Sequence, residues 1–140
     1  MIFCEEEMDI SFLEKIAQKM SDQNIELVLV DEKTMHEINL NQRGVDKTTD
    51  VLSFPLVQNC ENLLGSIVIN LDEVSKKAME YKHSNEEEMA LLFIHAMLHL
   101  QGYDHEVDQG QMRQKEQEWI EYFKLPKSLI IRTQEGDCND

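Results

Sequence analysis

The chain has 140 residues, of which 28 are acidic and 13 are Lys or Arg, so its formal net charge is -15. We expect residues 1–140 to form a single domain, because this length is sufficient for one substantial core. The acidic balance argues against bulk attraction to nucleic acid or anionic lipid, and no uncharged apolar stretch reaches the ~18 residues of a membrane span.

The N-terminal residues and the cysteines favour a cytoplasmic protein. The first nine residues, MIFCEEEMD, carry acids where an export signal needs basic residues. Cys4, Cys60 and Cys138 are far apart and form no CxxC pair. Neither a disulfide framework nor a cysteine zinc site is therefore indicated.

The first half of the chain predicts helices that alternate with strands. Apolar residues at helical spacing indicate a first amphipathic helix, and the β-branched run IELVLV indicates a strand. Asp31 is the expected N-cap of the next helix. In chain order, the predicted elements are a helix over about 10–20, a strand over 25–30, a helix over about 32–40, a loop at 42–46, and strands at 49–54 and 65–70.

Three further helices are predicted in the second half. One begins at Asn70 or Asp72 and runs to about Lys82, and the last covers about 108–123. Between them, Ser84 to Glu87 form a capping-box pattern that begins a helix. The acids of this run favour the positive end of that helix. This run and the other acidic runs of the chain are interpreted as solvated surface. Because the sequence MALLFIHAMLHL is apolar nearly all round, we expect this helix to be buried and central.

That helix carries a candidate metal site. His95 and His99 are four residues apart, so both imidazoles leave one helix face. Gly102 can adopt a left-handed conformation that ends the helix, so that the chain turns back and brings His105 to the same ion. Three neutral imidazoles with an open fourth position are typical of a catalytic zinc site, and we expect one zinc ion per chain. His36 and His83 have no comparable spacing and are predicted to be surface residues.

The histidine spacing matches the metzincin protease motif HExxHxxGxxH at each histidine and at the glycine. Ala96, however, stands where the proteases carry the glutamate that acts as general base. Peptidase activity is therefore the least favoured functional hypothesis.

A closer resemblance involves three blocks of sequence. The segment HAMLHLQGYDH resembles the signature HGxLHLxGYDH of the YbeY family of bacterial metal-dependent endoribonucleases, with Ala96 in place of a glycine. LNQRGVDKTTDVLSFP, residues 40–55, and LLGSIVIN, residues 63–70, are similar to two further segments of that family and follow in the same order. In the last segment, Ser66 replaces the usual aspartate.

This resemblance implies both a fold and an activity. The expected fold is α/β (α+β), with a small mixed four-stranded sheet packed with helices and a zincin-like central helix that carries the histidines. The implied activity is that of a zinc-dependent, single-strand-specific endoribonuclease. The resemblance further implies a role in ribosomal RNA processing, at the 3′ end of the small-subunit rRNA, and in ribosome quality control. His95, His99 and His105 match the metal ligands of the family, and Arg43 matches its functionally important arginine.

The chemistry of such a site leaves several roles open. Arg43 is the catalytic candidate, because a guanidinium can stabilise negative charge that develops at phosphorus. The alternative interpretation is that Arg43 is a loop arginine exposed to solvent. The nucleophile is either a water activated by the metal or the RNA 2′-OH. Asp104 either orients an imidazole or caps the turn after Gly102. No glutamate is assigned as general base.

The partner expected from the resemblance is ribosomal RNA, and no DNA or membrane partner is expected. Because the charge of -15 opposes RNA binding at long range, we expect a ribosomal particle or a ribosome-associated protein to supply affinity. The alternative function is a non-catalytic, metal-stabilised module that binds ribosomes or RNA.

Overall fold

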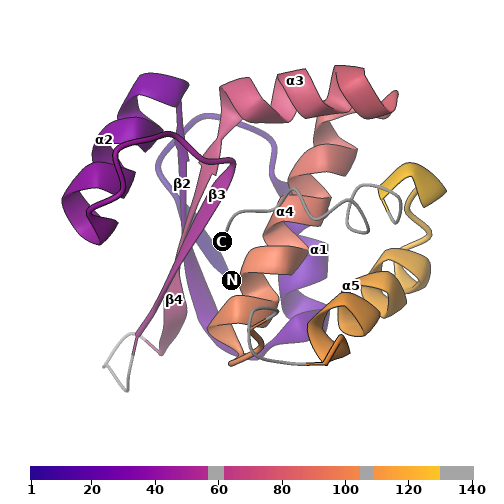
Figure 1. Ribbon diagram of the computed structural model, residues 1–140. Coiled ribbons are helices and arrows are strands. Elements are labelled where there is room, and N and C mark those ends of the chain that lie inside the picture. Colours follow the sequence, from indigo (N-terminus) through magenta and orange to yellow (C-terminus); the bar gives the residue numbers. More distant parts are fainter. Residues whose placement is uncertain (57–61, 105–108, 130–140) are drawn as a thin grey trace.

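The computed structural model describes residues 1–56, 62–104 and 109–129, and in these ranges five helices pack around one four-stranded sheet (Figure 1). The sheet is mixed: β1, β2 and β4 are parallel, and the edge strand β3 runs antiparallel to β4. In spatial order, the strands are β1 (Ile2–Cys4), β2 (Asn24–Val30), β4 (Leu63–Asn70) and β3 (Val51–Pro55). The helices are α1 (Ser11–Met20), α2 (Glu32–Arg43), α3 (Leu71–Tyr81), α4 (Asn85–Leu100) and α5 (Gln111–Tyr122).

The expected mixed α/β architecture is confirmed, with two local differences. The fourth strand, β1, was not predicted, because three residues are too few to show an alternating pattern; its partners are in β2, where Ile2 lies opposite Ile25. The helix predicted over 32–40 continues to Arg43, so the expected loop at 42–46 begins only at Gly44. No residue between positions 40 and 43 interrupts helical geometry, and Gly44 ends the helix in the left-handed region, at φ 70°.

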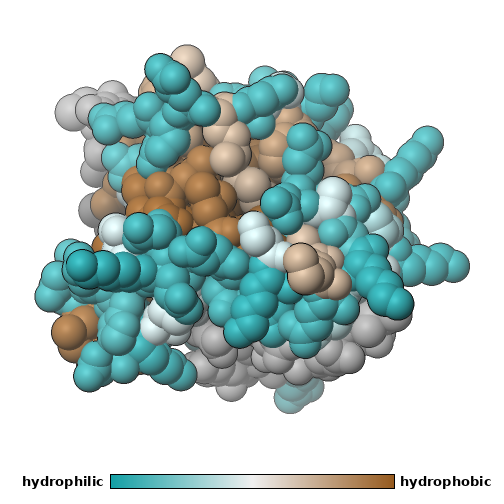
Figure 2. Space-filling view, turned by 90° about the horizontal axis from the view of Figure 1, so that it is seen from above, coloured by the Kyte–Doolittle hydropathy of each residue, from teal (hydrophilic) through white to brown (hydrophobic). Residues whose placement is uncertain are grey.

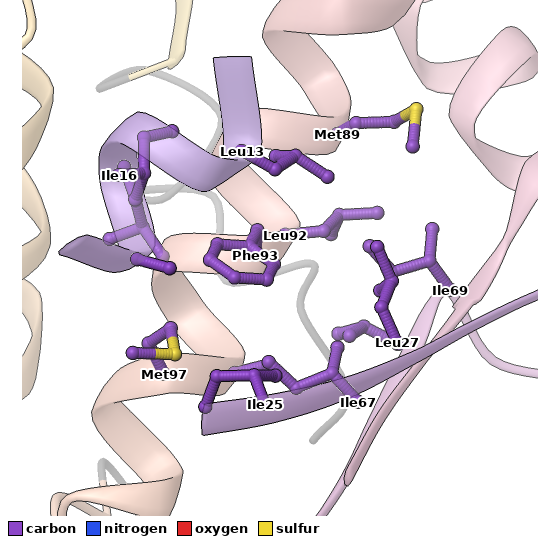
Figure 3. Packing of buried hydrophobic residues seen from close by; sticks show 14 of the residues in the cluster. Leu13, Ile16, Ile25, Leu27, Ile67, Ile69, Met89, Leu92, Phe93 and Met97 are labelled. Carbon is purple, nitrogen blue, oxygen red and sulfur yellow. The ribbon is translucent and has the colours of Figure 1, made fainter. Parts of the chain in front are cut away.

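The larger part of the core lies between the sheet and the pair α1 and α4. Figure 3 shows Phe93 and Leu92 of α4 between side chains of α1 and those of β2 and β4. Helix α4 is buried along almost its whole length from Glu88, as its apolar sequence predicts. It is therefore the rigid central element on which the histidines are carried.

Helix α2 covers the opposite face of the sheet. Met35 of this helix packs with Leu52 and Val68, whose side chains point away from the α4 side of β3 and β4. The sheet consequently separates α2, with Arg43 in its last turn, from the body of α4.

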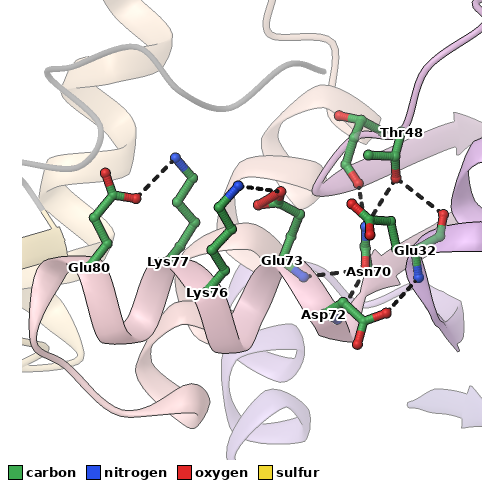
Figure 4. Close-up of polar contacts among 9 residues, drawn as sticks. Glu32, Thr48, Asn70, Asp72, Glu73, Lys76, Lys77 and Glu80 are labelled. Carbon is green, nitrogen blue, oxygen red and sulfur yellow. Dashed lines mark hydrogen bonds and ion pairs between the residues drawn. The ribbon is translucent and has the colours of Figure 1, made fainter.

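Asn70 joins three elements at one end of the sheet. Its side-chain amide donates to the Thr49 carbonyl (3.0 Å) and the Thr48 hydroxyl (3.1 Å), while its side-chain oxygen caps α3 by accepting from the backbone N–H groups of Asp72 and Glu73 (Figure 4). Asp72 in turn accepts from the backbone N–H of Glu32, at the start of α2. The start of α3 predicted at Asn70 or Asp72 is thus confirmed, with Asn70 as N-cap.

Hydrophilic residues cover most of the face shown in Figure 2, around a smaller area where hydrophobic residues reach the surface. Among the described residues, no helix is both long enough and apolar enough to cross a membrane. The most apolar helix, α4, has only 16 residues, short of the ~20 that a span needs.

Candidate active site

The two histidines of α4 face each other as their spacing predicts. Nε2 of His95 lies 3.1 Å from Nε2 of His99, and the ring planes meet at 82°. His95 is buried, at 3% exposure, whereas His99 is partly exposed. The two nitrogens therefore converge on a point at the edge of the core that solvent can reach.

The other ring nitrogen of each histidine is held by an acceptor. Nδ1 of His95 lies 2.6 Å from Oε1 of Glu116, and Nδ1 of His99 lies 3.1 Å from the carbonyl oxygen of Tyr103. A carboxylate and a carbonyl can only accept, so each neutral ring carries its proton on Nδ1. Both Nε2 atoms then present lone pairs toward the same point.

Such an arrangement fits a zinc ion. Two nitrogens that are each about 2.0–2.1 Å from a tetrahedral zinc lie roughly 3.3 Å apart, close to the 3.1 Å between the two Nε2 atoms. Two lone pairs that face each other at this distance repel unless a metal ion or a proton lies between them. His95 and His99 therefore have the geometry of two ligands, with Nδ1 oriented as in many metal-binding histidines.

Sequence reasoning missed Glu116. Its side chain is 6% exposed, and it reaches the His95 imidazole from α5, which contributes no histidine to the pair. The available signal was a helical stripe: Met112, Glu116 and Ile120 are spaced four apart and are the buried residues of α5. A charged residue within an apolar stripe indicates a buried polar partner.

The turn after α4 orients the second histidine. Gly102 adopts φ 100°, as expected. Its N–H donates to the His99 carbonyl, and the N–H of Tyr103 donates to the Leu98 carbonyl, which is the hydrogen-bond pattern of a Schellman motif. This turn places the Tyr103 carbonyl against Nδ1 of His99. The Tyr103 ring packs against the core, and His105, the third predicted ligand, lies outside the described residues.

Arg43 is in the last turn of α2 and not in a loop. Its Nη1 donates to Oδ1 of Asn39 at 3.4 Å, and the buried Asn39 amide donates to the Lys47 carbonyl at 2.8 Å. These contacts fix the start of the segment that leads from α2 toward β3. Arg43 itself is exposed.

Two surface predictions need correction. His83 is not a surface side chain: it is 1% exposed, with Nε2 2.8 Å from Oε1 of Glu88 and Nδ1 2.9 Å from the Ser128 hydroxyl. Glu88 is fully buried, so the acidic run 86–88 is not wholly solvated. The register of α4 turns Glu88 inward, and the bond to His83 satisfies it. His36, by contrast, is 45% exposed and pairs with Asp46.

Several other polar or reactive groups have structural contacts. Thr49 and Asp50 are both buried, and Thr49 donates to the Asp50 carboxylate at 3.4 Å. Ser66 donates to Glu26 at 2.6 Å across the sheet. Burial raises the pKa of the Cys4 thiol, which makes it a poor nucleophile. Ala96 lies within the core, at 1% exposure. Because its side chain is a methyl group, this helix position offers no general base for a peptidase mechanism.

Comparisons with known proteins point to the endoribonucleases. The model of the family described as Endoribonuclease YbeY matches residues 5–124. A protein named Endoribonuclease YbeY from Campylobacter jejuni strain 81-176 is 62% identical over 134 residues, which cover 95% of this chain and 98% of that protein. A protein of the same name from Wolinella succinogenes is 54% identical over 128 residues, with 91% of each chain covered.

A solved structure agrees in fold. The solution structure of a Thermotoga maritima protein superposes with a TM-score of 0.61 at 30% identity, and the match covers 100% of this chain and 96% of the other. The chain therefore belongs to the YbeY family of endoribonucleases, as its sequence motifs predicted.

Proposed function

We propose that this protein is a zinc-dependent endoribonuclease that cuts single-stranded regions of ribosomal RNA. Membership of the YbeY family supports the reaction class, hydrolysis of RNA. The donor set supports the metal: two convergent Nε2 atoms, 3.1 Å apart, on a buried helix. This convergence is the observation that carries the proposal, because it places two imidazole nitrogens where they can share one metal ion.

In this proposal, His95, His99 and His105 hold one zinc ion. When bound, zinc would stabilise negative charge on a phosphoryl group and lower the pKa of water. Glu116 holds the His95 ring and the Tyr103 carbonyl holds the His99 ring, so that both keep the tautomer that leaves Nε2 free of a proton. Glu116 is a positioning residue, since it acts through His95.

Arg43 is proposed as the residue that binds the phosphate. It stands at the C-terminal end of α2, where Asn39 and the Lys47 backbone fix the following segment. A guanidinium offers two parallel N–H donors to a phosphodiester, and these bonds strengthen as charge builds in the transition state. Arg43 would thus contribute to rate without being a metal ligand.

The biological setting is proposed to be cytoplasmic ribosome maturation, at the 3′ end of the small-subunit rRNA, with a further role in ribosome quality control. A formal charge of -15 weakens long-range attraction to RNA. A ribosomal particle or a ribosome-associated protein would then supply the affinity that the isolated chain lacks. Affinity for naked rRNA should accordingly be lower than affinity for small ribosomal subunits at the same salt concentration.

The test combines metal content with activity. Protein purified without added metal should contain about one zinc per chain, and it should cleave a single-stranded rRNA precursor but not a duplex. A chelator should abolish cleavage, and added zinc should restore it. Zinc-free protein with full activity would contradict the proposal. Zinc-loaded protein that binds the precursor without cutting it would instead favour the non-catalytic module.

A further inference from the structure

We propose that the groove between α1 and α5 is a second RNA contact, which binds an unpaired base and its phosphates. The groove has a volume of about 360 Å³ and is lined by Lys19, Lys115, Glu118, Trp119 and Tyr122. This inference rests on the proposed function in one respect, namely that the substrate is single-stranded RNA.

The aromatic side chains form the apolar part of the groove. Trp119 stacks on Phe123, with ring centroids 5.6 Å apart and planes at 20°. Tyr122 meets Trp119 edge-on at 5.5 Å, yet Tyr122 is 56% exposed. A large aromatic ring that is supported on one side by its neighbours and open on the other is a platform on which a base can stack.

Two lysines flank these rings in a chain that has more than twice as many acidic as basic residues. Lys19 is an exposed residue in the last turn of α1, and Lys115 is 45% exposed on α5. Lys115 lies 3.5 Å from Glu118. Exposed ion pairs of this kind contribute little, so a phosphate can replace the Glu118 carboxylate at Lys115.

Both helices that form the groove are held to α4, the helix that carries the histidines. On α5, Glu116 holds His95, and the neighbouring Lys115 begins the stripe that continues with Trp119 and Tyr122. On α1, the Met20 carbonyl accepts a 2.6 Å hydrogen bond from the Gln101 side chain, just beyond the end of α4. The groove therefore has a fixed position relative to the helix that carries the histidines.

This combination of groups selects for unpaired RNA. Base stacking requires a free π-face, which a base inside a duplex does not offer. The lysines bind phosphate irrespective of sequence. The groove would thus favour single strands over duplexes and contribute affinity with little sequence preference.

Trp119 makes a direct test possible, because it is the single tryptophan of the chain. Its fluorescence is titrated with a six-nucleotide uridine oligonucleotide, using full-length protein kept in chelator so that no zinc-dependent cleavage occurs. We expect saturable quenching that weakens with salt, with a slope equivalent to about two phosphates. A blunt RNA duplex of the same length should cause little quenching.

Variants at exposed positions then assign the binding. Tyr122→Leu and the double change Lys19→Gln with Lys115→Gln should each weaken oligonucleotide binding roughly tenfold, whereas Tyr122→Phe should keep wild-type affinity. Glu118→Gln should bind severalfold more tightly. Lys76→Gln is the matched control, since Lys76 is also an exposed helical lysine paired with a glutamate, Glu73, three residues away, and it should have no effect. Thermal unfolding confirms that each variant is folded.

The proposal is overturned if the oligonucleotide leaves Trp119 emission unchanged at low salt, or if Lys76→Gln weakens binding as much as the groove variants. It is also overturned if hexaglutamate competes as well as RNA, which would indicate a surface for an acidic protein segment. Because binding is measured without metal, its failure is distinct from failure of the catalytic proposal, which the zinc and cleavage assays decide separately.

Discussion

The carboxylate of Glu116 lies 2.6 Å from Nδ1 of His95, and this contact joins α5 to α4 across 21 positions of the chain. The two side chains are only 6% and 4% exposed. A short hydrogen bond in such a dry environment is strong and fixes the direction of the imidazole. The orientation of one proposed metal ligand therefore depends on a helix that contributes neither His95 nor His99.

Replacing Glu116 by glutamine should weaken metal binding without unfolding the protein. Glutamine keeps the shape and can still accept from Nδ1, but it lacks the negative charge that makes the imidazole a better ligand. We expect zinc affinity to fall about 10- to 100-fold, as measured by competition with a chromophoric chelator. Glu121→Gln, at an exposed position of the same helix, is the control and should leave affinity unchanged. If Glu116→Gln bound zinc as tightly as wild type, the contact between Glu116 and His95 would have only a structural role.

Arg43→Ala and His99→Ala should both lower cleavage, but only His99→Ala should also lower zinc binding. Arg43→Ala should retain zinc and stability, because the side chain is exposed, but should lower cleavage by roughly 10²–10³ if it stabilises transition-state charge. His99→Ala should lose both zinc and cleavage. Metal analysis and single-turnover cleavage on the same preparations separate the two effects, and wild-type cleavage by Arg43→Ala would remove this residue from the mechanism.

Adding a methyl group at Gly65 should destabilise the fold beneath the end of α4. A Cβ there would lie 2.5 Å from the Phe54 carbonyl oxygen and 2.6 Å from Cδ2 of Leu100, the residue after His99. Relief requires a shift of β3 or of the helix end, at a cost of roughly 1–3 kcal/mol. Urea unfolding of Gly65→Ala measures the cost. Ser66→Ala, which removes only a hydroxyl bonded to Glu26, is the neighbouring control and should lose less.

The N-cap of α2 should give stability a defined pH dependence. The pKa of the Asp31 carboxyl lies below its ordinary value of 3.8, because the carboxylate accepts hydrogen bonds from the Thr34 side chain and from the Thr34 backbone N–H. Because the pKa of Asp31 is lower in the folded state, its contribution to the free energy of unfolding is complete above the unfolded-state pKa. This contribution is lost as the pH falls through the folded-state pKa. The stability advantage of wild type over Asp31→Ala should thus be constant above about pH 5 and shrink below pH 3.8. Urea unfolding midpoints of both proteins, measured from above about pH 5 to below pH 3.8, test this prediction. A stability difference that does not change with pH would contradict it.

Local sequence patterns determined the features that depend on neighbours along the chain. The capping box is present as predicted, with Ser84 accepting from the N–H of Glu87 and Glu87 accepting from that of Ser84. The spacing of His95 and His99 brought their rings together, and Gly102 took the left-handed conformation that the turn requires. Capping, helical periodicity and glycine backbone freedom act within a few residues, so a single sequence reveals them. The family signature likewise lies in contiguous segments.

Only the tertiary structure decided the features that join distant segments. Strand β1 exists because Ile2 to Cys4 pair with β2, and the three residues carry no pattern of their own. His83 and Glu88 became a buried pair because the segment at Ser128 packs over them. Glu116 reaches His95 because α5 packs against α4 in one register. A buried charge is satisfied by whichever group lies opposite it in space, and that partner depends on how the helices pack, which spacing along the chain does not encode.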